Sequence, residues 1–333
     1  MQNKRTVIIT GAAGFIGSHM TELMLKKNFN VIGIDDLSTG SEENLKKVRG
    51  NKNFYFKKKD ILDLKNSEFL NKKVFYIFHF AGKGDVVPSI ENPFDYVNTN
   101  VLATTRICEI GKSLKIKKLV YAASSSCYGV NNKKLSENAS ISLEHPYALS
   151  KFYGEQIALN WCKIYNLPVN SIRIFNAYGP RVRTSSNYGA VFGVFFKQKL
   201  ENKPFTIVGN GNQKRDYVYV KDVCEAFYLA AQTKIIGEIF NLGTGKPQRI
   251  NYLAKILDCK NKVYIPKRPG EPNITWANIN KISKLLKWQP KTKFEKGVAI
   301  MLKDIEYWRK APLWNKQNIK KATKTWFKLL SKK

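Results

Sequence analysis

The sequence has no uninterrupted run of 18 or more apolar residues, so it predicts no membrane-spanning helix. Its first ten residues, Met1 to Thr10, lack the apolar stretch and the small-residue cleavage site of a secretory signal peptide. Cysteine and histidine are scarce: five cysteines stand singly, without C-x-x-C spacing, beside three histidines. This scarcity argues against a disulfide framework and against a zinc site. We therefore expect a cytoplasmic protein with reduced thiols and no metal.

Acidic residues are also few: 25, against 57 lysines and arginines, which gives a formal net charge of +32. A charge of that sign and size favours binding to polyanions such as nucleic acid. The lysines are spread along the whole chain, however, rather than gathered into one arm. We therefore expect no nucleic-acid partner. With 333 residues, 43% of them hydrophobic, the chain can bury a sizeable core.

Strand-like runs alternate with helix-like segments in the first half of the chain, the pattern of a parallel sheet wrapped by helices. The predicted strands are 6–10, 31–34, 53–56, 74–80, 118–123, 169–175 and, later, 239–242. The predicted helices are 15–27, 95–112 and 147–165. The pattern predicts an α/β fold, a Rossmann-type doubly wound parallel sheet over residues 1–175. A smaller mixed α/β substrate region follows over 176–311, with some elements returning to the first sheet, and a basic helical extension occupies 312–333.

A glycine-rich run follows the first predicted strand and opens the first predicted helix. Its expected cofactor contacts are Gly11, Gly14, Phe15, Ile16 and Gly17. Glycines there permit a tight turn and let backbone N–H groups approach a pyrophosphate at the helix N-terminus. Asp35 ends the next strand, where a carboxylate accepts hydrogen bonds from an adenosine ribose. With Asp36 beside it, Asp35 also repels a 2′-phosphate, so the pattern favours NAD over NADP.

The run Tyr147-Ala-Leu-Ser-Lys151 places a phenol and an ammonium four residues apart, on one face of a helix. A lysine ammonium and a cationic nicotinamide nearby favour the phenolate, so we expect a lowered pKa for the Tyr147 phenol. Some 23 residues earlier, a predicted strand ends in Ser124-Ser125-Ser126. A hydroxyl at this strand end is placed to hold a substrate oxygen while Tyr147 takes its proton. We predict Ser124, Tyr147 and Lys151 as the catalytic residues.

From about Thr6 to Met301 the chain resembles the extended short-chain dehydrogenase/reductase family, in its nucleotide-sugar epimerase and dehydratase group. The motifs that carry the resemblance, in the family's order, are TGAAGFIG, IDDLSTG, HFAGKGDVVPSI, ASSSCYG, PYALSK, RIFNAYGP, RDYVYVKD, FNLGTG and RPGEP. As a set they are highly specific. The resemblance implies NAD as cofactor and a nucleotide sugar as substrate. Within the group, the chain resembles enzymes of the UDP-glucose 4-epimerase type.

The resemblance also implies roles for individual residues. For the cofactor these are Asp60 and Ile61 beside the adenine, Phe80, Ala81, Gly82 and Asn100 along the dinucleotide, and Tyr147 and Lys151 at the nicotinamide ribose. For the substrate they are Ser125 and Ser126 at the sugar, Asn176, Arg215 and Arg268 at the diphosphate, and Glu271 at the ribose hydroxyls. Guanidinium groups suit bidentate phosphate recognition, although surface salt bridges are the alternative for the two arginines. Cys127 is expected in the core rather than as a nucleophile.

The fate of a 4-keto sugar separates the two reactions of this group. A 4-epimerase returns the hydride to the other face and needs no further acid or base. A 4,6-dehydratase typically carries Asp-Glu directly after the hydroxyl residue, where this chain has Ser125 and Ser126, neither of which is an acid or base near pH 7. We therefore expect a 4-epimerase of a UDP-hexose or UDP-N-acetylhexosamine, with a uronic acid also open. The alternatives are a dehydratase that uses Asp85 or Glu91, and a non-catalytic NAD(H)-binding protein.

The segment 312–333 contains seven lysines and no acid. Its apolar side chains and one threonine share a helical face, made of Ile319, Thr323, Trp326, Phe327 and Leu330. We expect a terminal helix packed on its own domain or on a partner subunit, with docking on anionic lipid as the alternative. The predicted helices 95–112 and 147–165 correspond to those that the family pairs across a twofold axis, which implies a homodimer.

Overall fold

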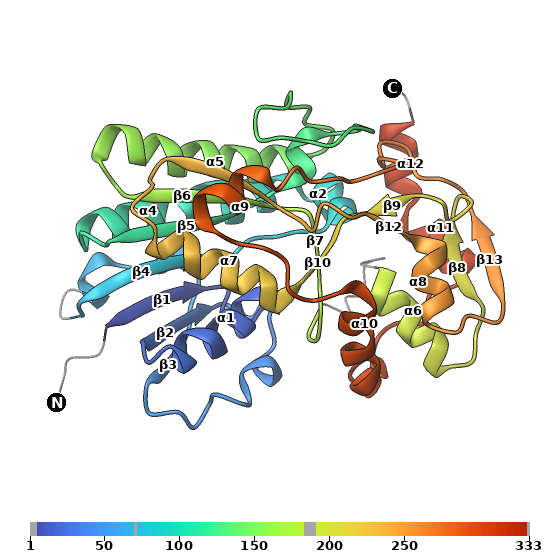
Figure 1. Ribbon diagram of the computed structural model, residues 1–333, viewed down its shortest axis with the longest axis horizontal. Coiled ribbons are helices and arrows are strands. Elements are labelled where there is room, and N and C mark those ends of the chain that lie inside the picture. Colours follow the sequence, from blue (N-terminus) through green and yellow to red (C-terminus); the bar gives the residue numbers. More distant parts are fainter. Residues whose placement is uncertain (1–4, 70–71, 183–190, 332–333) are drawn as a thin grey trace.

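The computed structural model describes residues 5–69, 72–182 and 191–331, and it centres on a seven-stranded sheet in which every pair of neighbours is parallel (Figure 1). The strand order is β11-β6-β5-β4-β1-β2-β3. The strands are β1 (Thr6–Thr10), β2 (Asn30–Asp35), β3 (Phe54–Lys58), β4 (Val74–His79), β5 (Lys118–Ser124), β6 (Val169–Ile174) and β11 (Glu238–Leu242). This confirms the predicted Rossmann-type class, with strand ends within two residues of those expected.

Successive strands are added to the sheet in one direction from β1 to β3 and in the opposite direction from β4 to β6. The topological switch point therefore lies between β1 and β4. Ligands of open parallel sheets bind beyond the carboxyl ends of the strands at such a switch point. Alternating side chains of β1 enter two cores: Val7 packs in a core with Met20, and Ile8 packs in another with Ile107. The sheet is therefore the middle of three layers.

The four longest helices of the described residues divide between the two faces of the sheet. They are α1 (Phe15–Lys26) and α7 (Val220–Gln232) on one face, and α4 (Ala103–Ser113) and α5 (Pro146–Tyr165) on the other. Although α7 and β11 follow residue 176 in the sequence, both pack in the first sheet's layers, and the core below α1 continues into the substrate region.

The segment predicted as a helix over 95–112 is helical throughout, but it is not a single regular α-helix. The structure has α3 (Pro93–Val97), a π-helical turn (Asn98–Leu102) and then α4. The turn directs the amide of Asn100 inward, where its Oδ1 accepts from the backbone N–H of Lys83 (2.9 Å) and its Nδ2 donates to Ser150 Oγ (2.9 Å). Such turns widen a helix locally and are common at functional sites.

The substrate region consists of short elements on the C-terminal side of the sheet (Figure 1). Its strand pairs are β7 (Asn176–Tyr178) with β10 (Tyr217–Tyr219), β9 (Lys214–Arg215) with β12 (Gln248–Arg249), and β8 (Phe205–Val208) with β13 (Lys262–Ile265). Its helices are α6 (Val191–Leu200), α8 (Ile250–Ile256) and α10 (Phe294–Lys303), whereas α9 (Asn280–Leu286) packs back on β11 and α7. From the first domain, α2 (Val86–Glu91) reaches toward this region.

The basic tail forms two short helices, α11 (Lys316–Ala322) and α12 (Lys324–Leu330), rather than the single helix that was expected. Asn315 begins α11 with a capping box, and Thr323 stands between the two helices. Ile319, Thr323 and Trp326 are buried against the chain itself, as expected for a tail packed on its own domain. Among the described residues, none of the helices has the length and apolarity needed to cross a membrane.

Candidate active site

The glycine run forms a tight loop between β1 and α1. Gly11 has a positive φ of 68°, and a Cβ on it would lie 2.7 Å from the backbone nitrogen of Ala81. A Cβ on Gly17 would collide with the Gly11 carbonyl oxygen. Gly14 stands at the N-cap of α1 and has no side chain with which to cap it. The backbone N–H groups at this helix start are therefore accessible to a pyrophosphate, which the helix dipole also favours.

Asp35 ends β2 beside this loop, and its carboxylate is held by the backbone. Its Oδ2 accepts from the Ala13 N–H (2.9 Å) and its Oδ1 from the Leu37 N–H (2.8 Å). Burial raises the pKa of Asp35, and these N–H donors oppose that rise. Asp36 is exposed, and its Oδ1 accepts from both the backbone and the hydroxyl of Ser38. Both carboxyl groups line the same cavity, where adenosine ribose hydroxyls would meet them.

One cavity gathers fourteen of the fifteen residues that the sequence assigned to the cofactor. They are Gly11, Gly14, Phe15, Ile16, Gly17, Asp35, Asp36, Asp60, Ile61, Phe80, Ala81, Gly82, Tyr147 and Lys151. Asn100 is the exception: its buried amide binds Lys83 and Ser150 and lies outside the described lining, so its contact with the cofactor stays a prediction. Through its hydrogen bonds with the backbone of Lys83, the Asn100 amide supports the loop beside Gly82. The tight glycine cradle and the ribose-side carboxylates fit a bound NAD.

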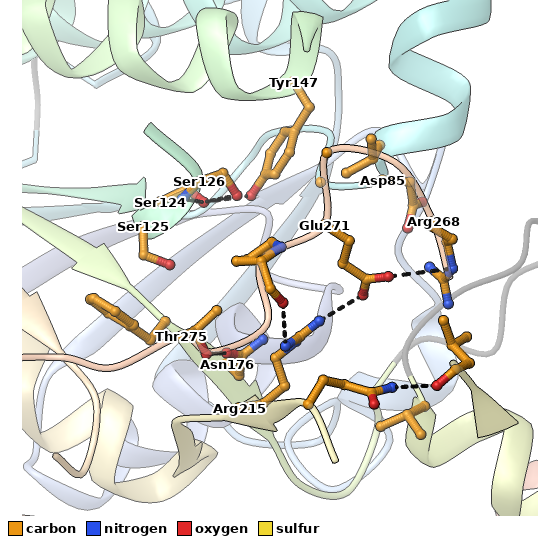
Figure 2. A pocket seen from close by; sticks show the side chains of 18 of the residues that line it. Asp85, Ser124, Ser125, Ser126, Tyr147, Asn176, Arg215, Arg268, Glu271 and Thr275 are labelled. Atoms are coloured by element: carbon orange, nitrogen blue, oxygen red, sulfur yellow. Dashed lines mark hydrogen bonds and ion pairs between the residues drawn. The ribbon is translucent and has the colours of Figure 1, made fainter. Parts of the chain in front are cut away.

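Ser124 and Tyr147, two of the three predicted catalytic residues, meet where β5 ends and α5 begins (Figure 2). The Tyr147 hydroxyl donates to Ser124 Oγ over 3.0 Å. Ser124 Oγ in turn donates to Ser126 Oγ (3.0 Å) and accepts from the Ser126 N–H (3.2 Å). A phenol and a hydroxyl at this spacing can hold one substrate oxygen between them and move its proton.

Burial has the largest effect on the pKa values of Tyr147 and Lys151 in the protein alone. Burial is the largest influence on Tyr147 and raises its pKa, while its side-chain hydrogen bonds with Ser124 and Ser126 oppose the rise. Burial also lowers the pKa of Lys151 to about 7. The expected lowering of the Tyr147 pKa concerns the complex with a cationic nicotinamide; in the protein alone, desolvation disfavours both the phenolate and the ammonium. Lys151 Nζ lies 4.5 Å from the centre of the Tyr121 ring.

A second cavity contains every residue that the sequence assigned to the substrate. They are Ser125, Ser126, Asn176, Arg215, Arg268 and Glu271. Ser124 and Tyr147 line both this cavity and the cofactor cavity, so the two join at the catalytic pair. The alternative dehydratase acids differ: Asp85 lines both cavities, whereas Glu91 is exposed and lies outside their described linings.

The two arginines converge on Glu271 inside the cavity (Figure 2). Arg215 Nη2 donates to Glu271 Oε1 at 2.8 Å, and Arg268 Nε lies 3.6 Å from Glu271 Oε2. Burial alone would raise the pKa of Glu271, but the two guanidinium groups together hold it below its usual value. The arginines are therefore not surface salt bridges, and one carboxylate places two cations side by side for an anionic ligand.

Sequence reasoning missed several residues of this cavity. Thr275 Oγ1 donates to Asn176 Oδ1 (2.7 Å), and the His145 ring stacks on Tyr147 with its centre 5.8 Å away. Trp326, from the tail, also lines the cavity. Thr275 and His145 stood outside the residues that the motifs assigned to the site, and Trp326 was interpreted as part of a docking face.

Two negative expectations concern metals and cysteine. In the part of the chain that the structure describes, there is no cluster of three or more His, Cys, Asp or Glu side chains that could hold a metal. Cys127 is buried, and burial raises the pKa of its thiol to about 12, which suits core packing and not a nucleophile.

A Rossmann-type sheet with a cofactor cavity and a Tyr–Lys–Ser group defines the class of short-chain dehydrogenases/reductases. Residues 8–301 match the model of the GDP-mannose 4,6-dehydratase family. The chain belongs to this family of nucleotide-sugar enzymes.

Three relatives show the range of this family. A Bacillus subtilis (strain 168) protein described as an uncharacterized UDP-glucose epimerase, YtcB, is 34% identical and covers 88% of this chain and 95% of its own. The crystal structure of UDP-glucuronic acid 4-epimerase from Bacillus cereus, with UDP-glucuronic acid and NAD, is 32% identical, with a TM-score of 0.85 over 91% of this chain and 99% of that one. UDP-N-acetylglucosamine 4-epimerase from Methanobrevibacter ruminantium M1, in complex with UDP-N-acetylmuramic acid, is 30% identical, with a TM-score of 0.84 over 91% and 100%.

Proposed function

We propose that this chain is an NAD-dependent 4-epimerase of UDP-linked sugars. The observation that carries the proposal is the 3.0 Å hydrogen bond between Tyr147 and Ser124 at the junction of the two cavities. A sugar whose diphosphate lies on the two arginines would present its ring to that pair. The relatives named above, described as epimerases of UDP-glucose, UDP-glucuronic acid and UDP-N-acetylglucosamine, support the reaction class.

The residues divide the chemistry between them. When bound, NAD supplies the acceptor for a hydride from carbon 4 and later returns it. Tyr147 takes the proton of the 4-hydroxyl, and Ser124 holds the 4-oxygen through its own hydroxyl. The charge of Lys151 favours the phenolate that this step requires. After the 4-keto sugar has turned over in the cavity, Tyr147 returns the proton, so the net change is inversion at carbon 4.

The place of the sugar follows from the charges around the cavity. Arg215 and Arg268 each pair with Glu271 and would bind the diphosphate together with Asn176, which lines the same cavity. Glu271 would accept hydrogen bonds from the nucleoside ribose hydroxyls. Glucose, glucuronic acid and N-acetylglucosamine, the sugars in the names of the three relatives, are the first candidates.

A 4,6-dehydratase is the second candidate, because Asp85 lines both cavities and a carboxylate there could remove the carbon-5 proton. The positions directly after Ser124 argue against it, since Ser125 and Ser126 are not acids. Purified protein incubated with each UDP-sugar in deuterated water, with products followed by NMR, separates the two. A hexose diastereomer without deuterium at carbon 5 supports the epimerase. A 4-keto-6-deoxy sugar carrying deuterium there contradicts it.

We further propose a cytoplasmic homodimer that serves polysaccharide biosynthesis. Large apolar side chains on the helices expected at the dimer axis are exposed: Phe94 in α3 at 76%, Leu102 in the π-helical turn at 49% and Tyr153 in α5 at 50%. Exposed apolar groups gathered on one helix pair favour a partner surface. Solution scattering that gives the mass of a monomer would contradict the dimer.

A further inference from the structure

The second tail helix, α12, lies against the substrate cavity, although it is beyond the residues that match the family model. The chain reaches it through an anchored segment. Gln198 of α6 donates to the Trp314 carbonyl (2.8 Å), and Ile319 of α11 is buried. From there α12 crosses to α2, which it contacts and which lines the other side of the same cavity (Figure 1). The tail therefore links the substrate region to the first domain at the mouth of the site.

Besides its contact with α2, α12 meets three consecutive residues of the loop before Glu271, namely Arg268, Pro269 and Gly270. The guanidinium carbon of Arg268 lies 5.5 Å from the centre of the Trp326 ring. The Trp326 indole N–H donates to the Pro269 carbonyl over 2.7 Å. A Cβ placed on Gly270 would lie 3.9 Å from Leu330 Cδ1. Trp326 is only 6% exposed and lines the cavity.

These contacts have a direct consequence for an anionic ligand. Arg268 is held from one side by Glu271 and from another by the indole face, which attracts a cation through its π electrons. The hydrogen bond to Pro269 fixes the backbone beside it. A long arginine side chain loses much rotational freedom when it binds a phosphate, and a side chain already held in place loses less.

We propose that α12 is a built-in part of the nucleotide-sugar site, and that Trp326 is a positioning residue that holds Arg268 ready for the substrate diphosphate. This inference rests on the proposed function, because it takes the diphosphate as the ligand of Arg268. It assigns the basic tail to substrate binding instead of to lipid docking. Trp326 touches neither Ser124 nor Tyr147 in the described contacts, so its effect falls on binding and not on the chemical step.

The test compares three variants as NAD-containing enzyme. Trp326→Leu removes the ring and the N–H, Trp326→Phe keeps a ring, and Leu329→Ala, an exposed position of the same helix, is the matched control. For Trp326→Leu we expect the KM of the nucleotide sugar and the Kd of UDP to rise together, about 5- to 30-fold. We expect kcat within twofold of the parent. The KM and Kd of Trp326→Phe should lie between those of Trp326→Leu and the parent, and those of Leu329→Ala should equal the parent's.

Two results would overturn the inference. One is a folded Trp326→Leu enzyme whose KM and UDP Kd stay within twofold of the parent. The other is a loss confined to kcat. If Trp326→Leu does not fold, a chain ending at Thr323 retains α11 and gives the same comparison, and unchanged UDP binding by it overturns the inference equally. Failure of the proposed function would be seen in the parent itself, which would then neither bind UDP nor turn over any nucleotide sugar.

Discussion

Replacing Tyr147 with phenylalanine removes the hydroxyl that lies 3.0 Å from Ser124 Oγ and leaves the ring that stacks on His145. A positioned acid/base group contributes about 10²- to 10⁴-fold to a rate, or about 3–5.5 kcal/mol in the barrier. Ser124→Ala removes a hydrogen bond to the 4-oxygen, worth about 1.5–3 kcal/mol while that oxygen carries charge. Because both groups act on one proton, the double variant should lose little more than Tyr147→Phe alone.

The assay is single-turnover kinetics with a saturating UDP-sugar, and NAD content is measured in each variant. Tyr165→Phe, an exposed tyrosine at the far end of the same helix, is the control and should keep full activity. A Tyr147→Phe enzyme with more than about a tenth of the parent rate would refute the assignment of the base, given the contribution expected of one. A double variant whose loss equals the product of the two single losses would show that the hydroxyls act independently.

Three further predictions concern cofactor choice, pH and stability. Asp35→Ser should weaken NAD binding about tenfold and raise the affinity for NADP relative to that for NAD, as measured by fluorescence titration. An unchanged ratio of the two affinities would contradict the role of Asp35. Burial lowers the Lys151 pKa to about 7, from its usual 10.5, so between these two pH values the unfolded chain binds more protons than the folded chain. The free energy of unfolding should therefore rise with pH over that interval. A series of melting curves at increasing pH measures the rise, and the cofactor-free Lys151→Met variant should lack it. Glu155 Oε2 lies 2.6 Å from Arg173 Nη2 in the core. Glu155→Ala leaves the buried arginine charge unpaired and should lower the free energy of unfolding in urea by about 3–5 kcal/mol, and a decrease of less than about 1 kcal/mol would argue against this role.

The cofactor half of the site was predictable because its signals are local. A glycine run between a strand and a helix, and Asp35 at the end of the next strand, need only the order of elements to be placed. Tyr147 and Lys151 share a helix, so their spacing sets their common face. The π-helical turn that directs the Asn100 amide toward Lys83 was not predicted, because such turns have no recognisable sequence pattern.

The substrate half depends on contacts between distant segments, which only the fold brings together. Asp216 illustrates this: its carboxylate accepts from the Thr244 N–H (2.6 Å) and the Ala277 N–H (3.0 Å), which fixes the loops on either side of Arg215. The resemblance placed Arg215 and Arg268 but could not reach Trp326, which lies outside the family's motifs. The rise that burial gives the Tyr147 pKa in the protein alone was not predicted for a similar reason, since burial depends on everything packed around the ring.

The central claim is that the sugar is oxidised at carbon 4 and reduced again at the same carbon. The most direct measurement uses the UDP-sugar that turns over, labelled with deuterium at carbon 4, with the product examined by NMR and mass spectrometry. The account predicts an epimer that keeps the label at carbon 4, because the hydride taken from the sugar returns to it. Deuterium found at carbon 6 of a 4-keto-6-deoxy sugar, or an epimer that has lost its label to solvent, would contradict the account.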